Sequence, residues 1–104
     1  MDSSFRSYYA VIFTSKHSDS TEGYSEMASY MQALAENQKG FLGIESARND
    51  IGITVSYWES LEAIAQWKAN TEHLHAQKLG KSKWYESYRV RICKVERDYS
   101  FESA

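Results

Sequence analysis

The stretch GFLGIESARNDIGITVSYW, residues 40–58, decides the fold, because it predicts a β-hairpin. Residues 41–48 and 51–58 are rich in β-branched and aromatic types, and Asn49-Asp50 between them favours a tight turn. Side chains alternate between the two faces of a strand, so the second strand presents two different sets. One set is Ile51, Ile53, Val55 and Tyr57, and the other is Gly52, Thr54, Ser56 and Trp58. We therefore predict two adjacent antiparallel strands with distinct faces.

A helix precedes the hairpin, and a strand precedes that helix. The helix is predicted from one apolar face with the spacing of an α-helix, formed by Tyr24, Met27, Ala28, Met31, Leu34 and Ala35. Lys39 and Gly40 suit its C-terminal end, with Gly40 as a left-handed cap. Residues 15–20 are polar and predict a loop that offers N-caps. Residues 7–14 predict a strand that is apolar on both faces, which needs cover on both sides. Two helices cover one side, and a second copy of the chain is the economical cover for the other.

A second helix and a last strand follow the hairpin. We predict Ser60 as the N-cap of this helix and Leu61, Ile64 and Trp67 among its inward residues. Asn70-Thr71 is expected to interrupt it, and a short helical piece continues to Leu79 and stops at Gly80. Residues 81–84 form a connection, and residues 85 to about 99 form a long strand. The order β-α-β-β-α-β is the ferredoxin-like arrangement. We therefore expect one α+β domain, residues 1–104 with a core of about 7–99, built as a four-stranded antiparallel sheet with two main helices.

Charge and composition narrow the classes of partner. The 104 residues carry a formal net charge of −2, so we expect no nucleic-acid partner, although an RNA recognition motif has the same element order. The run Lys81, Lys83, Trp84, Tyr85 could touch RNA, but Ile stands in the second hairpin strand where stacking aromatics are needed. No apolar run reaches the length of a membrane helix, and the N-terminus lacks a signal-peptide pattern. With Cys93 as the single cysteine, a reducing cytoplasm is the expected location.

An ordered series of short segments carries a resemblance to a known family. The series is Gly40-Phe41-Leu42-Gly43-Ile44-Glu45-Ser46, Val55-Ser56-Tyr57-Trp58-Glu59-Ser60-Leu61-Glu62-Ala63-Ile64, Trp67-Lys68, Glu72-His73, Ala76-Gln77, Leu79-Gly80, Trp84-Tyr85, Tyr88-Arg89 and Val95-Glu96-Arg97-Asp98-Tyr99. Over roughly residues 7–99 the chain resembles the antibiotic biosynthesis monooxygenase domain family of the dimeric α/β-barrel superfamily. The resemblance implies a homodimer whose two sheets pack face to face into a barrel, with a pocket between each sheet and its helices.

The same resemblance implies a choice of chemistries. Some members oxidise polycyclic phenols with molecular oxygen and no metal or flavin, because the substrate itself supplies the electrons. Others bind and degrade haem, with a histidine ligand downstream of a tryptophan on the second helix and an asparagine on the first strand. Here Trp67 matches the tryptophan, but His73 lies closer to it than that spacing and residues 8–14 contain no asparagine. Haem is therefore disfavoured, and no cofactor is expected.

Three residues are the catalytic candidates, and each has a plainer alternative. Trp67 would be an aromatic wall of the pocket, or would simply pack its helix on the sheet. His73 would be a general base, or a surface residue. Arg89 would hold an anionic substrate through charge-assisted hydrogen bonds, or would pair, like Arg91, with an acid such as Glu45 across the sheet or the dimer interface.

Substrate contacts are assigned to Trp58, Trp84 and Tyr88, with Trp58 as a second stacking wall and Tyr88 as a polar contact. No metal site is expected, because His73 and His75 point about 200° apart on a helix. Cys93 is interpreted as a small hydrophobic residue. The predicted function is a monooxygenase-like domain for a small aromatic or quinone-type molecule. The alternative is a non-catalytic domain that binds or senses a small molecule or haem, so whether the chain is an enzyme stays open.

Overall fold

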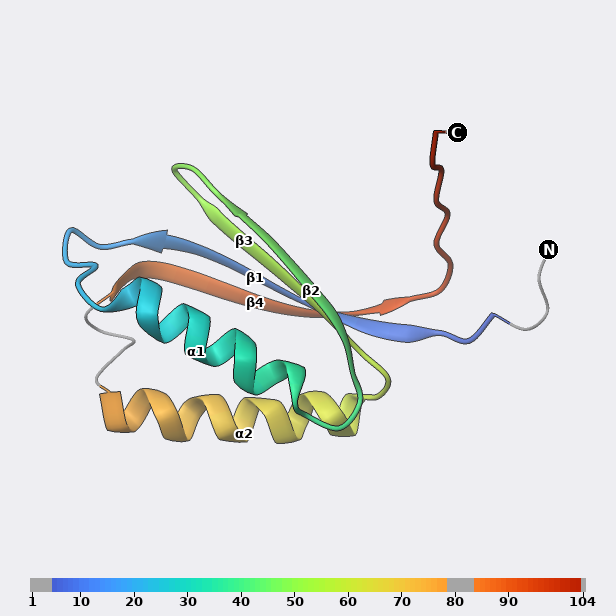
Figure 1. Cartoon of the computed structure of the whole chain (residues 1–104), viewed down its shortest axis with the longest axis horizontal. Helices are drawn as coiled ribbons and strands as arrows, with labels where there is room; N and C mark the ends of the chain where they lie inside the picture. Colours follow the sequence, from blue (N-terminus) through green and yellow to red (C-terminus); the bar gives the residue numbers. More distant parts are fainter. Residues whose placement is uncertain (1–4, 79–83, 104) are drawn as a thin grey trace.

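The computed structural model describes residues 5–78 and 84–103, with the side chains of the second helix described as far as Thr71. Its elements are β1 (Tyr8–His17), α1 (Tyr24–Glu36), β2 (Phe41–Arg48), β3 (Gly52–Trp58), α2 (Leu61–Lys78) and β4 (Tyr85–Val95). The four strands form one sheet of order β2-β3-β1-β4, and every neighbouring pair is antiparallel. The predicted ferredoxin-like βαββαβ fold is confirmed. Figure 1 shows that both helices lie on the same face of the sheet.

The strand register sorts the side chains into a helix-covered face and an open face. One row on the helix-covered face is Arg48, Gly52, Ser15 and Tyr88, running from β2 to β4. One row on the open face is Glu45, Val55, Ile12 and Arg91. The two faces that the sequence predicts for residues 52–58 are those of the sheet, because Thr54 and Ser56 face the helices.

The hydrophobic core lies where α2 begins. Trp58, Ala63 and Ile64 are buried there, and Tyr9, Val11, Phe41 and Trp67 pack partly buried against them. The N-cap prediction for Ser60 is confirmed, because its Oγ accepts a hydrogen bond from the Ala63 backbone N–H at 3.1 Å. Leu61 was expected to point inward, but 54% of it is exposed. Ala63 takes the inward place, because the helix begins at Leu61 and its first turn faces β3 through position 63.

Strand β1 continues to His17, so the prediction of a loop from residue 15 was wrong. Ser15 pairs with Gly52 on one side and Tyr88 on the other, and His17 pairs with Tyr85. Polar residues have low intrinsic strand preference, but pairing with β4, and for Ser15 also with β3, satisfies backbone groups and overrides that preference.

Helix α2 is continuous from Leu61 to Lys78, so the predicted interruption at Asn70-Thr71 was also wrong. Thr71 Oγ1 donates a hydrogen bond to the Lys68 carbonyl at 2.9 Å, which satisfies the hydroxyl inside the helix. Asn70 Nδ2 donates to Gln38 Oε1 at 3.1 Å, in the segment after α1. Both side chains therefore have partners that leave the helix intact. The predicted stop at Leu79 and Gly80 lies outside the described residues.

Four boundaries differ from the prediction by a few residues. Helix α1 ends at Glu36 with Asn37 as its C-cap, and Gly40 turns the chain into β2 with a φ of 86°. The N-cap of α1 is Gly23, and no side chain caps it. Strand β3 begins at Gly52 rather than at residue 51, and β4 ends at Val95 rather than near residue 99.

Candidate functional site

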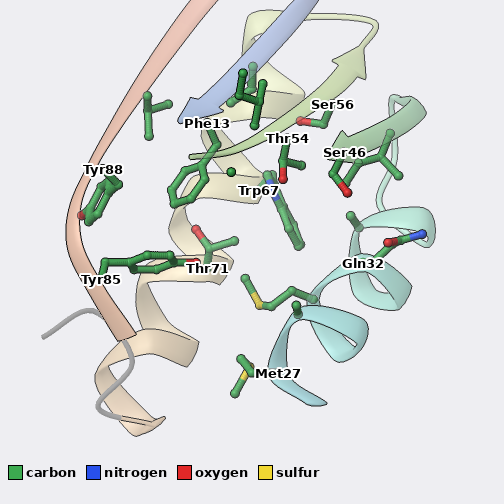
Figure 2. Close-up of a pocket in the computed structure, with 18 of the residues that line it drawn as sticks. Phe13, Met27, Gln32, Ser46, Thr54, Ser56, Trp67, Thr71, Tyr85 and Tyr88 are labelled. Atoms are coloured by element: carbon green, nitrogen blue, oxygen red, sulfur yellow. The ribbon is translucent and has the colours of Figure 1, made fainter. Parts of the chain in front are cut away.

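A cavity of about 850 Å³ lies between the sheet and the two helices. This volume is within the usual range for small-molecule sites, about 300–1,000 Å³. Its lining comes from all four strands and both helices, and much of it is apolar, including Val11, Met27, Met31, Ile44 and Ile92. Figure 2 shows the Trp67 indole projecting from α2 into the middle of this space, with Phe13, Tyr85 and Tyr88 on the β4 side.

Trp67 joins the cavity to the core. Its ring stacks on Trp58 with centroids 5.8 Å apart and planes 28° apart. Trp58 itself is fully buried, and its Nε1 donates to Ser56 Oγ at 2.9 Å. The predicted candidate Trp67 thus lines the cavity, whereas Trp58 lies behind the lining and supports it.

The end of the cavity nearest the start of β4 is a cluster of aromatic rings. Tyr24 contacts Trp84 and Tyr85 edge to face, each with centroids 5.8 Å apart. Phe13 stacks on Tyr88 at 5.4 Å. Trp84 Nε1 donates to the Glu22 carbonyl at 2.9 Å, which ties the residue just before β4 to the segment before α1. The predicted contacts Trp84 and Tyr88 both line the cavity.

Burial raises the pKa of the Tyr85 phenol, and a hydrogen bond with Tyr24 raises it further. A phenol with a raised pKa stays protonated, so Tyr85 offers a hydrogen bond rather than a base.

Arg89 does not line the cavity. Its register partner on β1 is Thr14, which places it on the open face with Arg91 and Cys93. The alternation predicted for β4 is confirmed, with Arg89 and Arg91 opposite Val90 and Ile92.

The arginine of the cavity is Arg48, which was not among the residues predicted from the sequence. A usable signal was present, because Ile44, Ser46 and Arg48 alternate along β2 and so share one face. What the sequence did not show was which of the two faces the helices cover.

One histidine that was not predicted from the sequence, His17, lies against the aromatic cluster beside the cavity. His73 belongs to α2, but its side chain lies outside the described residues. His17 was not a candidate, yet its ring contacts Tyr24 at 4.3 Å between centroids, and its Nε2 is buried without a hydrogen-bond partner among the described residues. Burial lowers the pKa of His17, and the nearby charge of Arg48 lowers it further.

The described lining contains some, but not all, of the side-chain types that hold haem iron. Iron is usually held by histidine, thiolate, methionine or tyrosinate. The described lining residues include no histidine or cysteine, and the raised pKa of Tyr85 opposes a tyrosinate at that residue; Met27, Met31, Tyr24 and Tyr88 are the other lining residues of these types. Among side chains that the structure describes, no group of three His, Cys, Asp or Glu residues is arranged to hold a metal ion.

The open face carries its own polar network. Tyr57 Oη donates to Glu45 Oε1 at 2.7 Å, and this hydrogen bond raises the pKa of Tyr57 to about 12. The Tyr8 hydroxyl donates to Asp98, and the Tyr8 and Tyr57 rings meet edge to face at 5.9 Å.

No described helix has both the length and the apolar character needed to span a membrane.

Comparison with known proteins agrees with this architecture. The family model for antibiotic biosynthesis monooxygenase matches residues 7–79. The uncharacterised protein YqjZ of Bacillus subtilis (strain 168) is 53% identical over 97 residues, which cover 91% of this chain and 85% of YqjZ.

Two solved structures share the fold at low sequence identity. SnoaB, a cofactor-independent oxygenase from Streptomyces nogalater, is 9% identical with a TM-score of 0.71, covering 88% of this chain and 95% of that chain. The heme-degrader MhuD from Mycobacterium tuberculosis, with two hemes bound in its active site, is 20% identical with a TM-score of 0.67, covering 88% of this chain and 99% of that chain. At these identities the likeness shows the fold alone, whereas the family match spans most of the chain. The chain belongs to the antibiotic biosynthesis monooxygenase family.

Proposed function

We propose that the cavity binds a small aromatic or quinone-type molecule and that the domain oxidises it with molecular oxygen, without metal or flavin. The observation that carries this proposal is the shape and chemistry of the lining: an indole, several phenol rings and aliphatic side chains around about 850 Å³. Flat rings on both sides suit a flat substrate, because offset and edge-to-face contacts between rings are favourable. Family membership supports the same chemistry, and SnoaB, a cofactor-independent oxygenase, has the same fold.

The proposed reaction is the oxidation of an anthrone-type phenol, whose ring system contains a methylene carbon. Loss of a proton from this carbon gives an anion, which donates electrons to oxygen. One oxygen atom becomes the carbonyl oxygen of the quinone, and the other leaves as water with both methylene hydrogens. Trp67 would form the wall on which the rings lie, and Tyr88 would contact the substrate hydroxyls. His73 remains the proposed base.

Oxygen uptake tests this proposal directly. With 1,8-dihydroxyanthrone as the probe, the protein should speed both oxygen consumption and formation of the anthraquinone. One molecule of oxygen should be consumed for each molecule of quinone formed. Protein treated with a chelator should retain the rate. A rate equal to that of buffer alone, across anthrones and naphthols that bind, would overturn the oxygenase proposal.

One observation favours a second candidate, a domain that binds or senses the ligand without turning it over. The described lining residues include no aspartate, glutamate or histidine, so among them there is no strong general base. Saturable binding of ring compounds without any oxygen uptake is the result expected of this alternative.

The haem branch of the family is tested by a haemin titration, followed by absorbance and by thermal unfolding. We expect no saturable binding of one haemin per chain. Saturable binding that raises the melting temperature, and whose Soret change is lost in His73→Ala, would show that haem is a ligand after all. A ligand at 100 times its dissociation constant stabilises by about 2.7 kcal/mol, which is easily seen.

We further propose that the chain is a homodimer formed through the open face of the sheet. The single chain is extended for its length: its radius of gyration is 15.2 Å, against about 13 Å for a compact domain of this size. Part of that extension is the segment after β4, which runs away from the sheet in Figure 1 and leaves Tyr99 and Phe101 82% and 89% exposed. We propose that a second copy of the chain covers these two aromatic residues.

The open face is complementary to itself in one orientation. The row Glu45, Val55, Ile12, Arg91 runs from an acid on β2 to a base on β4. A two-fold axis parallel to the strands would reverse this row in the partner, so that Glu45 faces the partner's Arg91 and the apolar pair meets the apolar pair. The same axis would put Tyr57 opposite the partner's Ala10, a large side chain against a small one. An axis across the strands would instead bring β2 against β2, acid against acid. We also propose a cytoplasmic location. Cys93 is exposed in the single chain and would be covered by the partner in the dimer. The cytoplasm keeps such a thiol reduced.

A further inference from the structure

We propose that the Arg48 guanidinium is the anion-binding group of the cavity, so that the preferred ligand is an acid: an aromatic ring system that carries a carboxylate, sulfonate or phenolate. This inference rests on the proposed function, because it specifies the class of molecule that the cavity takes.

Arg48 reaches the cavity by lying across Gly52, which has no side chain to block it. It is the last residue of β2, and its register partner on β3 is Gly52, whose partner on β1 is Ser15. The guanidinium lies directly over Gly52, where even a Cβ atom would overlap it. Its Nη2 donates to Ser15 Oγ at 2.5 Å, and Ser15 is only 2% exposed. The glycine therefore lets the arginine cross one strand and anchor on the next.

One ring of the aromatic cluster, that of Tyr24, also lies near the guanidinium. Arg48 Cζ lies 5.8 Å from the centre of the Tyr24 ring, within the range of a cation–π contact. A guanidinium held between a hydroxyl and a ring has a fixed orientation, and it retains N–H donors that Ser15 does not use. Such a pre-oriented fork is suited to the two oxygens of a carboxylate or sulfonate.

The charge of the cavity favours an anion. Its described lining includes Arg48 and Lys68 but no acidic side chain, in a chain whose formal net charge is −2. The described ion pair of β1 and β4 joins Lys16 to Glu86 and does not involve Arg48. Among the described residues, then, Arg48 has a hydroxyl and a ring as partners rather than a carboxylate. A cationic group beside a largely apolar cavity attracts anions more strongly than the same group in open water.

Arg48 lies in the same row across the sheet as one of the aromatic residues that would contact the ring system of the ligand. Tyr88 ends the row that Arg48 begins, and Tyr88 stacks on Phe13. An acid group on Arg48 would therefore place an attached ring system beside Phe13, Tyr85 and Tyr88, with Trp67 further along the cavity.

The test compares two fluorescent probes with the same ring system. 8-Anilinonaphthalene-1-sulfonate carries one sulfonate, and N-phenyl-1-naphthylamine is its neutral counterpart. We expect both to bind the folded protein saturably. Arg48→Gln should weaken binding of the sulfonate by about tenfold or more, since a charge-assisted pair is lost, and change the neutral probe less than twofold. Arg6→Gln makes the same charge change at an exposed N-terminal residue, and should leave both affinities unchanged.

Gly52→Ala separates position from charge. It keeps Arg48 but displaces the guanidinium from its position over residue 52 and from Ser15. We expect the same selective loss of sulfonate binding. Because the overlapping atoms are the flexible end of a side chain, this variant should fold; thermal unfolding of each variant verifies that. Arg48→Lys should recover only part of the affinity, because an ammonium cannot reproduce the fork.

The possible results separate this inference from the function on which it rests. If the neutral probe binds but the sulfonate is unaffected by Arg48→Gln, or if both probes weaken equally, the anion site is wrong while the ring-binding cavity stands. If neither probe binds saturably to the wild-type protein, the ring-binding cavity is wrong, and the anion site is wrong with it.

Discussion

Trp67 belongs both to the core and to the cavity, since its ring stacks on the buried Trp58 and also lines the open space. We predict that Trp67→Ala lowers the free energy of unfolding by about 2–3 kcal/mol, toward the low end for such truncations because the residue is only partly buried. It should also weaken binding of N-phenyl-1-naphthylamine by more than tenfold.

The matched variant Trp67→Phe keeps a flat ring. Urea unfolding and probe titration should show it within about 1 kcal/mol and twofold of wild type, as expected for a packed wall. If Trp67→Phe loses oxygen uptake while it keeps probe binding, the indole has an electronic part in the reaction instead.

His17 makes stability depend on pH near neutrality. Burial lowers the pKa of its imidazole from the ordinary 6.5, and Arg48 lowers it further, with Tyr24 and Tyr85 as its other neighbours. The folded protein thus disfavours the charged form, whereas the unfolded chain protonates at its ordinary pKa. Stability due to neutral His17 is therefore present above pH 6.5 and is lost as the pH falls from there toward the folded pKa.

We predict that urea unfolding between pH 7.5 and 5.5 shows a decline in stability that His17→Gln makes shallower. His75→Gln removes another histidine of the chain and serves as the comparison. An equal slope in wild type and His17→Gln would show that His17 does not carry the effect.

At the scale of elements, the junction between α1, β2 and α2 depends on Gly40. Its φ of 86° is in the left-handed region, and its carbonyl accepts the Glu59 N–H at 2.8 Å. A Cβ at residue 40 would lie 2.7 Å from the Cβ of Ala63 in the buried first turn of α2. Gly40 thus permits both the turn and the close approach of α2.

Gly40→Ala should therefore lower the free energy of unfolding by about 2–4 kcal/mol, from backbone strain and steric overlap together. Gly43→Ala is the matched control, because a Cβ there meets Tyr57 at an ordinary 3.9 Å. Thermal and urea unfolding of the two variants should separate them clearly. A similar loss at both positions would mean that the cost comes from glycine replacement in general.

At the scale of the whole molecule, the dimer proposal turns on the opposed charges of the open face. Glu45→Arg would place like charges opposite each other across the proposed two-fold axis, and so would Arg91→Glu. Each single variant should weaken self-association by about tenfold or more, and the double exchange should restore much of it. Light scattering and sedimentation over a range of concentrations measure this.

Glu62→Arg makes the same charge change as Glu45→Arg, but on α2 and away from the open face. It should leave the association unchanged. Failure of the double variant to recover while each single variant dissociates would argue for a different axis.

The sequence predicted the elements whose signals are local. The hairpin of residues 41–58 shows its period of two, and Ser60 caps the helix that begins next to it. Trp67, Trp84 and Tyr88 were selected as large aromatics near the expected pocket, and all three line it. The errors at Ser15, Lys16, His17 and Asn70 arose where partners distant in sequence override the preference of polar residues, whereas Thr71 stays helical because its hydroxyl donates to the Lys68 carbonyl of the same helix.

What the sequence by itself determined is the order of helices and strands and the alternation along each strand, because both follow from neighbours within a few residues. Only the tertiary structure decided which face of the sheet the helices cover, and so which arginine enters the cavity. Arg48 and Arg89 look equivalent along the chain, since each belongs to the alternating pattern of a predicted strand. Packing of both helices on one face puts Arg48 over Gly52 beside the cavity and leaves Arg89 on the open face. The reason is physical: a strand fixes which residues share a face, but only long-range packing assigns that face to ligand or to partner.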